Sequence, residues 1–250
     1  MAGSIQLSAV MIAKDAAPTI GAALRSVRFC DEIVVVVDEL SSDDTLPIAQ
    51  GTADRVEVLP WSGYGPAKRA AIALSRGAWV LVIDADEEVT PELARAIREA
   101  ITREDSGVVA YRMRRRTRFL GRWMRYGDWG RDRVTRLFRR GGAEMSADLV
   151  HETVTVRGRE ETLEGILLHQ GDQSIEEYLA RREKYTTLAA EAMYRQGRRS
   201  PWIEPYAKAV FKFIQAYLIR LGFLDGRQGF VLAWRSAGAV YLKYAKLRGM

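Results

Sequence analysis

The chain has 250 residues, of which 48% are hydrophobic, and a formal net charge of +6 at pH 7. That length allows one full hydrophobic core with an appendage, or two small domains. The single cysteine, Cys30, excludes an internal disulfide framework and fits a reducing compartment. The first residues lack the basic segment and the unbroken apolar run of a secretory signal. We therefore expect a cytoplasmic protein.

The positive charge is concentrated near the C-terminus. Residues 206–250 hold eight Lys and Arg residues and one acidic residue, Asp225, so they carry a net charge of +7 and the rest of the chain carries −1. Basic segments of this kind bind anionic lipids or nucleic acids. The sequence contains no recognised nucleic-acid-binding module. An anionic membrane surface is therefore the expected partner, and nucleic acid is not.

The first half of the chain alternates predicted strands and helices. Strands are predicted from continuous apolar or β-branched runs, and helices from apolar residues spaced three or four apart. The predicted strands are Leu7–Ala13, Glu32–Val37, Arg55–Val58, Trp79–Ile83 and Val108–Arg112, and the helices between them are Pro18–Arg28, Asp43–Gln50, Pro66–Ser75 and Pro91–Thr102. This order predicts an α/β fold with a doubly wound, parallel sheet.

The pattern changes after residue 113. Short strands are predicted at Val134–Phe138, Thr153–Arg157 and Leu163–His169, followed by a long helix that ends near Arg195. A basic hinge at residues 197–201 then leads into two tail helices. We therefore expect a first domain over residues 1–172 and a helical extension over residues 173–250.

The first tail helix is amphipathic. Its apolar residues recur at helical spacing, and Lys208, Lys212, Gln215 and Arg220 lie off that face; the apolar set is Val210, Phe211, Ile214, Tyr217, Leu218 and Leu221. Charges interrupt both tail segments well short of the ~20 apolar residues that a membrane span needs. Basic amphipathic helices with Trp and Tyr lie on anionic membrane surfaces. A helical hairpin packed on the sheet, or a dimer, fits the same pattern, so both alternatives stay open.

An acidic motif, Asp84-Ala85-Asp86-Glu87, directly follows the predicted strand Trp79–Ile83. Open α/β sheets bind ligands at the carboxyl ends of their strands. Three carboxylates at that edge repel one another, so a positive group must compensate them. A divalent cation that carries substrate phosphates is the expected one. The alternative is an acidic loop ahead of the helix that Thr90-Pro91-Glu92 begins.

The ends of the first two strands narrow the choice of ligand. The first strand ends in Lys14-Asp15 without the glycine triplet of a dinucleotide fingerprint, which argues against an NAD or FAD enzyme. The second strand ends at Asp38, where a carboxylate can accept hydrogen bonds from a ribose or a base edge. Ser42 and Asp43 fit the cap of the next helix.

Taken together, these motifs resemble those of a known family. The turn from Asp38 to Thr45, the segment Trp61–Arg69 and the motif Asp84–Glu87 resemble the family 2 nucleotide-sugar glycosyltransferases. Two further sets, in Phe119–Trp123 with Asp132–Arg140 and in Val150-His151-Glu152, are similar to the lipopolysaccharide core β-1,4-glucosyltransferases of that family. The resemblance covers residues 7–185. The family commonly has an Asn-Glu pair where this chain has Lys14-Asp15-Ala16, so the contact on the nucleotide side differs here.

The resemblance implies a GT-A fold with a mixed sheet and a helical appendage. It implies a metal-dependent, inverting transfer from a nucleotide sugar, with UDP-glucose or a similar donor as the leading choice and Mg²⁺ or Mn²⁺ as cofactor. The implied acceptor is a lipopolysaccharide core or another lipid-linked envelope glycan. The expected location is peripheral, on the inner face of the plasma membrane, and a homo-oligomer stays open. The alternative is a non-catalytic GT-A-fold protein that acts as a scaffold in a membrane-associated envelope-assembly complex.

The resemblance also assigns donor-binding residues by position. Asp38 would contact the nucleoside and Asp54 the base, whereas Asp84 would lie near the ribose. Asp86 would bind the metal directly. Lys68 or Arg69 would lie near the nucleotide or its diphosphate, and Arg136 near the donor phosphates.

The last two candidates are Glu152 and His169. Inverting transfer needs one carboxylate that deprotonates the acceptor hydroxyl, and the resemblance assigns this role to Glu152; the alternative is a surface glutamate. His169 follows an apolar strand and would complete the metal shell or contact the leaving diphosphate. A histidine satisfied at a strand end is equally compatible. The arginines between Arg112 and Arg125 would bind an anion or form the solvated face of a strand.

Overall fold

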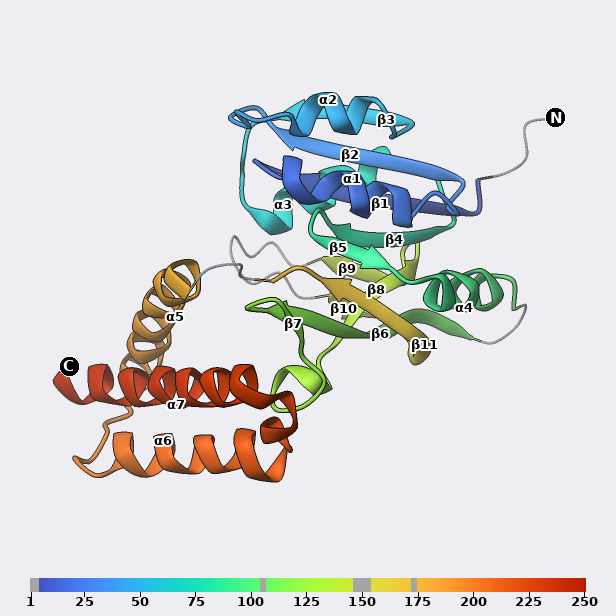
Figure 1. The fold of residues 1–250 in the computed structure, drawn as a ribbon. Coiled ribbons are helices and arrows are strands. Elements are labelled where there is room, and N and C mark those ends of the chain that lie inside the picture. The colour runs from blue at the N-terminus through green and yellow to red at the C-terminus, as the bar shows by residue number, and fades with distance from the viewer. Residues whose placement is uncertain (1–4, 104–106, 146–153, 172–174) are drawn as a thin grey trace. The chain divides into compact units, whose positions relative to one another are not determined.

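The computed structural model describes residues 5–103, 107–145, 154–171 and 175–250. The chain forms two compact units (Figure 1), the first from Met1–Arg115 and Arg133–His169 and the second from Arg116–Asp132 and Gln170–Met250. The expected boundary after residue 172 lies three residues beyond the observed one. The segment Arg116–Asp132, expected in the first domain, groups with the helices instead.

The first unit is an α/β layer structure. Its strands are β1 (Leu7–Ala13), β2 (Glu32–Asp38), β3 (Arg55–Leu59), β4 (Trp79–Asp84), β5 (Glu87–Val89), β6 (Val108–Phe119, which continues into the second unit), β8 (Arg133–Arg139), β9 (Ala143–Met145), β10 (Val154–Val156) and β11 (Arg159–His169). Its helices are α1 (Ala17–Ser26), α2 (Thr45–Gln50), α3 (Tyr64–Leu74) and α4 (Pro91–Ile101). Each predicted element of the first half is present; most ends are shifted by one or two residues, whereas β6 continues to Phe119, well beyond the predicted end at Arg112.

The sheet is mixed. Its strand order is β3-β2-β1-β4-β8-β6-β11-β5. Strand β1 pairs in parallel with both β2 and β4, and β2 pairs in parallel with β3. Beyond β4, strands pair in the antiparallel sense: β4 with β8, β8 with β6, and β11 with β5. Strands β9 and β10 form a separate antiparallel pair. The parallel half of the sheet therefore resembles the predicted fold, and the later strands extend it in the antiparallel sense.

Side chains on the two faces of the central strands pack into two apolar clusters. Leu7, Ala9 and Met11 of β1 point to the cluster that contains residues of α1 and α4. Val10 and Ile12 point to the other cluster, which contains Ala67 and Ala71 of α3. Because β1 is buried on both faces, its residues are apolar except for the buried Ser8, and they do not alternate with exposed polar residues.

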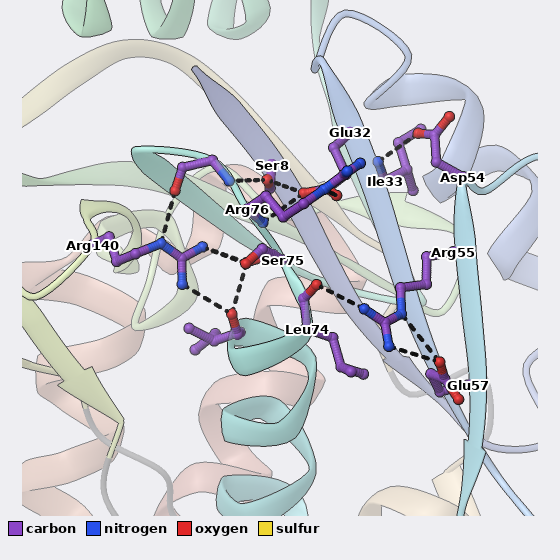
Figure 2. Close-up of polar contacts among 12 residues, drawn as sticks. Ser8, Glu32, Ile33, Asp54, Arg55, Glu57, Leu74, Ser75, Arg76 and Arg140 are labelled. Carbon is purple, nitrogen blue, oxygen red and sulfur yellow. Dashed lines mark hydrogen bonds and ion pairs between the residues drawn. The ribbon is translucent and has the colours of Figure 1, made fainter. Parts of the chain in front are cut away.

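A polar network holds together the amino ends of β1 and β2 (Figure 2). The buried Glu32 carboxylate accepts hydrogen bonds from Ser8 Oγ at 2.5 Å and from Arg76 Nε at 2.7 Å. Ser8 Oγ in turn accepts the backbone N–H of Gly77 at 2.7 Å. Arg140 donates to the carbonyl oxygens of Gly77 and Ser75 at 3.0 and 2.8 Å. The turn between α3 and β4 is thereby fixed, which sets where β4 begins and where its acidic end lies.

Replacing Gly77 with alanine is expected to destabilise the first unit by about 1 to 3 kcal/mol, because an added methyl group overpacks a filled site. A Cβ atom at Gly77 would lie 2.6 Å from both Ser8 N and Ser8 Oγ. Gly51→Ala is the control, since its nearest neighbour would be an ordinary 3.5 Å contact with the Pro47 oxygen. Urea denaturation measures both. Equal stability of the two variants would contradict the prediction.

The second unit is mainly helical. Its elements are β7 (Arg122–Trp123), which pairs with the end of β6, then α5 (Ile175–Arg195), α6 (Glu204–Ile214), a π-helical turn (Gln215–Ile219), a 3₁₀ turn (Gly222–Asp225) and α7 (Gly226–Gly249). A further 3₁₀ turn spans Trp129–Arg131. Helices α6 and α7 lie side by side as a hairpin (Figure 1).

Asp225 anchors the turn of that hairpin. Its buried carboxylate accepts the backbone N–H groups of Arg125 and Tyr126 at 2.9 and 2.8 Å. Lys212 of α6 pairs with Asp128 at 2.8 Å. These contacts explain why Arg116–Asp132 belongs to the helical unit. Among the described residues, no helix combines the length and apolar character needed to cross a membrane.

Candidate functional site

Most of the predicted donor-site residues gather at one edge of the sheet. In the pairings of β1, Ala13 lies opposite Val37 of β2, and Ile12 lies opposite Asp84 of β4. The carboxyl ends of these three parallel strands therefore lie together. Asp38 ends β2 and Asp84 ends β4, so both acids reach the edge at which open α/β sheets bind ligands.

Asp38 is buried beneath a lysine. Lys14 Nζ lies 2.7 Å from Asp38 Oδ2, and the backbone N–H of Leu40 donates to Asp38 Oδ1 at 3.0 Å. These two contacts lower the pKa of Asp38 below its usual value. The Asp38 side chain is inaccessible to solvent, whereas that of Lys14 is 40% exposed. A ligand at this position would therefore meet the ammonium group of Lys14 first.

A set of short polar side chains joins the loops after β1 and β2. Asp43 Oδ2 accepts the N–H of Ala17, at the start of α1, and Asp43 Oδ1 accepts the N–H of Thr45. Asp15, whose φ of 44° is in the left-handed region, accepts the N–H of Ser42 at 2.8 Å. Ser42 and Asp43 were expected to cap the following helix, but the N-cap residue of α2 is Asp44, which makes no side-chain capping hydrogen bond. Asp43 instead ties the starts of α1 and α2 together, which holds this edge of the site in place.

Asp84 lies between two cations. Lys68 Nζ of α3 is 2.6 Å from Asp84 Oδ1, and Arg136 of β8 donates to Asp84 Oδ2. Burial by itself would raise the pKa of Asp84, but Arg136 and Lys68 outweigh it and hold that pKa far below its usual range. The same pairing raises the pKa of Arg136 despite its burial. Both groups are therefore charged at any physiological pH.

Glu87 of β5 places a second carboxylate beside Arg136. Its buried carboxylate lies 2.7 Å from Arg136 Nη2 and 3.2 Å from Arg115 Nη1, and it accepts the backbone N–H of Asp84 at 3.1 Å. Lys68, Arg115 and Arg136 thus face the two carboxylates of Asp84 and Glu87. We name these five residues the charge cluster.

The charge cluster corrects one expectation. From the sequence, repulsion among three carboxylates was the reason to expect a bound cation. In the structure, lysine and arginine side chains already compensate Asp84 and Glu87. These three cations come from α3, β6 and β8, and their pairing with the motif depends on the tertiary fold. The case for a metal therefore rests on Asp86 alone.

Asp86 differs from its neighbours in the motif. Its side chain is 40% exposed, and Asp86 Oδ2 lies 3.2 Å from Nε2 of His169. The pairing of β11 with β5 places His169 opposite Glu87, which brings the imidazole to the acidic motif. His169 and Asp86 are therefore together, as expected for two ligands of one metal. No group of three potential ligands occurs within the described residues.

The helix start that competed with this interpretation is also present. The Thr90 hydroxyl accepts the N–H of Leu93 at 3.4 Å, and α4 begins at Pro91. The acidic motif can therefore be part of a ligand site and also precede a helix. Asp84 and Glu87 belong to the charge cluster, whereas Thr90 forms the cap of α4.

Two predicted donor residues lie elsewhere. Asp54 precedes β3, and its carboxylate accepts the N–H of Ile33 at 2.8 Å near the start of β2 (Figure 2). That is the amino end of the parallel strands, so the structure does not bring Asp54 together with Asp38 and Asp84. Arg69 follows Lys68 on α3 and is exposed, because successive residues of a helix point about 100° apart. Of that pair, Lys68 is the residue at the site.

The arginine-rich segment proves mixed. Arg112 and Arg114 lie exposed on β6, and Arg112 pairs with Glu160 at 2.9 Å, as a solvated strand face predicts. Arg115 instead reaches Glu87. The ion pairs of Arg115, Glu87 and Lys14 were not predicted from the sequence. Each residue nevertheless carried a signal, since Glu87 belongs to the acidic motif, Arg115 belongs to the arginine-rich segment, and Lys14 directly follows a predicted buried strand. The proposed base, Glu152, lies outside the described residues.

A family model, two relatives and a solved structure match this chain. A model of glycosyl transferase family 2 matches residues 8–156. An uncharacterized glycosyltransferase from Rickettsia prowazekii is 29% identical over 255 residues, which is 98% of this chain and 87% of the relative. The lipopolysaccharide core biosynthesis glycosyltransferase LpsC from Rhizobium meliloti is 28% identical over 259 residues, or 98% of this chain and 95% of the relative. A structure of S. aureus TarS 1–349 matches with a TM-score of 0.49 and 14% identity, over 98% of this chain and 90% of that one.

Proposed function

The chain belongs to glycosyl transferase family 2, and from that premise we propose that it transfers a sugar from a UDP-sugar to a lipopolysaccharide core or another lipid-linked envelope glycan. The expected family is confirmed, and so is the GT-A fold, with its mixed sheet and C-terminal helices. The protein is a glycosyltransferase that uses a nucleotide-sugar donor, so the scaffold alternative is not carried further.

The observation that carries the proposal is the arrangement at the carboxyl ends of β2 and β4. Lys14 covers Asp38 there, and the charge cluster surrounds Asp84. The cluster holds three cations against two carboxylates, an excess of one positive charge. A preorganised cationic edge stabilises the negative charge that develops on a departing nucleoside diphosphate. Arginine and lysine supply this stabilisation without reorganising during the reaction.

Asp86 and His169 fit a divalent cation, Mg²⁺ or Mn²⁺. One carboxylate and one imidazole supply an oxygen and a nitrogen ligand, and Mg²⁺ typically takes one or two carboxylates together with substrate phosphates. Asp86 is suited to this role because its side chain is accessible, whereas Glu87 is buried against Arg115 and Arg136. A bound cation would act as a Lewis acid toward the diphosphate.

The proposed chemistry is a single displacement with inversion. The acceptor oxygen forms a bond to the anomeric carbon while the bond from that carbon to the phosphate oxygen breaks. The proton of the acceptor hydroxyl passes to Glu152, and UDP leaves with the electron pair of the broken bond. Arg136 and Lys68 favour this departure electrostatically through the cationic edge of the site.

Two observations support the acceptor and the location. LpsC, similar to this chain over nearly its whole length, is named for lipopolysaccharide core biosynthesis. The described helices do not include a membrane span, and residues 206–250 carry a net charge of +7. We therefore propose a peripheral enzyme that meets its lipid-linked acceptor on the inner face of the plasma membrane.

Metal-dependent nucleotide binding tests the donor site. UDP with Mn²⁺ at a hundredfold its dissociation constant is expected to stabilise the protein by about 2.7 kcal/mol, seen as a rise in melting temperature that Asp86→Ala largely removes. The same measurement with GDP, CMP and dTDP compares the bases.

Asp54→Asn is the control for that experiment, because Asp54 lies at the opposite end of β3 from the site. It is expected to keep the full shift with UDP and Mn²⁺. A lost shift in Asp54→Asn would restore Asp54 as a donor contact. An unchanged shift in Asp86→Ala would contradict the metal role, and no shift with any nucleotide would contradict the proposed donor.

A further inference from the structure

Helix α6 exposes an apolar side. Phe213 lies on the side facing α7, with its ring 5.8 Å from that of Phe230 and 6.2 Å from that of Trp234. On the outer side, four large apolar residues of α6 and the following π-helical turn are between 40% and 60% exposed: Val210, Phe211, Ile214 and Leu218. A soluble amphipathic helix normally turns such a stripe toward a core. Here most of the apolar stripe predicted from the sequence faces solvent, whereas Tyr217 packs against Phe213 and Phe230.

The exposed surface continues around the hairpin. Leu221, Phe223 and Leu224 in its turn are each more than 40% exposed. On α7, Phe230 and Trp234 are 45% and 65% exposed, four residues apart and thus on one side of the helix. Trp202 and Tyr206, near the start of α6, are also exposed. We name this set of exposed apolar residues on α6, α7 and their turn the hairpin face.

The exposed apolar residues and the charge together indicate what covers the hairpin face. Monomeric soluble proteins rarely expose a contiguous apolar patch larger than a few hundred Å², and larger ones mark protein or membrane contacts. Lys208 and Arg227 are exposed on the same two helices, and the segment from residue 206 carries a net charge of +7. Apolar residues with Trp and Tyr, accompanied by Lys and Arg, are the composition of helices that lie in the interface of anionic membranes.

We propose that the hairpin face of α6 and α7 lies in the headgroup region of an anionic bilayer, with both helices parallel to its surface. This deepens the proposed function, since it rests on a lipid-linked acceptor and names the surface that brings the enzyme to it. The hairpin does not cross the membrane. Such helices bury their apolar side about 5–10 Å into the boundary between headgroups and acyl chains, so Trp234 and Ile214 enter the lipid while Lys208 contacts anionic headgroups.

The test is cosedimentation of the full chain with vesicles of phosphatidylglycerol and phosphatidylcholine at low salt. The wild type is expected to bind these vesicles and to bind pure phosphatidylcholine at least tenfold more weakly. The double variant Ile214→Asp with Leu218→Asp is expected to lose at least tenfold in partitioning. Leu188→Asp is the matched control, because Leu188 is also an exposed leucine of the helical unit but lies on α5; it is expected to bind like the wild type.

Tryptophan fluorescence with brominated lipids reports the orientation. Quenching is expected in the wild type and is expected to fall in Trp234→Phe, whereas Trp79→Phe leaves it unchanged because Trp79 is buried in β4. Equal binding of the wild type and the double variant would overturn the proposal. So would a wild type that self-associates without lipid while the double variant is monomeric, since the hairpin face would then join two copies.

Nucleotide binding by the same variants separates this proposal from the proposed function. The thermal shift with UDP and Mn²⁺ is expected to be the same in the wild type and the double variant. Vesicle binding without any nucleotide shift would contradict the donor site and leave the membrane surface intact. A nucleotide shift without vesicle binding would contradict the membrane surface and leave the donor site intact.

Discussion

Replacing Arg136 with methionine is expected to destabilise the first unit by about 3 to 5 kcal/mol, the cost typical of breaking a buried ion pair by removing one partner. Arg136 has a side chain 9% exposed and contacts both Asp84 and Glu87. Without it, the inaccessible Glu87 carboxylate loses its closer cationic partner and retains the longer contact with Arg115. Chemical denaturation of the wild type and the variant measures the difference in the free energy of unfolding.

The pH dependence gives this prediction a second readout. The pKa of Asp84 is lowered in the folded state, so its contribution to stability is present above the unfolded pKa of about 3.9 and is lost as the pH falls through the folded value. Arg136→Met removes part of that contribution. The difference in stability between the wild type and the variant is therefore expected to be constant near neutral pH and to shrink in acid.

Arg112→Met is the matched control. Arg112 also pairs with a glutamate, Glu160, but its side chain is 47% exposed, and exposed pairs contribute about 1 kcal/mol or less. Should Arg136→Met cost no more than Arg112→Met, the charge cluster would be a solvated surface network rather than a buried one. Arg136→Lys tests geometry, since it keeps the charge but cannot reproduce the guanidinium fork.

Glu152→Gln is expected to reduce sugar transfer at least about a hundredfold while leaving UDP binding nearly unchanged, because general base catalysis contributes 10²–10⁴-fold. Glutamine keeps the size of the side chain but does not accept the proton of the acceptor hydroxyl. Release of UDP from UDP-glucose, with truncated lipopolysaccharide as acceptor, measures the rate. The thermal shift with UDP and Mn²⁺ measures donor binding in the same preparation.

The control for Glu152 is Glu164→Gln, an exposed glutamate on β11 that is expected to keep full activity. Two results would contradict the assignment of the base. The first is more than a tenth of the wild-type rate in Glu152→Gln. The second is a loss of the nucleotide shift along with the rate, which would place Glu152 in donor binding instead.

The order of strands and helices in the first half of the chain was predictable because it depends on local patterns. Leu7–Ala13 is apolar apart from Ser8 and Trp79–Ile83 is an unbroken apolar run, and such runs form strands buried on both faces. The position of Asp84 at a strand end followed directly from the second run. The predicted strand at Arg55–Val58 also placed Asp54 at the amino end of a parallel strand, away from the site, so this misplaced donor residue was open to correction from the sequence itself.

The partners of the acidic motif needed the tertiary structure. Lys68 lies 16 residues before Asp84, and Arg136 lies 52 residues after it. They meet Asp84 because α3 packs over the sheet and β8 pairs with β4. Ion pairs between such distant residues depend on strand register and helix packing, which no local pattern encodes. For the same reason, the local pattern of three carboxylates did not show that lysine and arginine side chains compensate Asp84 and Glu87.

Local patterns are enough to predict a strand-ending acidic motif on an α/β sheet and an amphipathic, basic tail. How the charges are compensated, and which side of the tail helix is left exposed, depends on tertiary packing. Periodicity shows that Val210, Ile214 and Leu218 share one side of a helix, but it does not show what covers that side. Because α6 packs against α7 through Phe213, its other apolar side stays in contact with solvent.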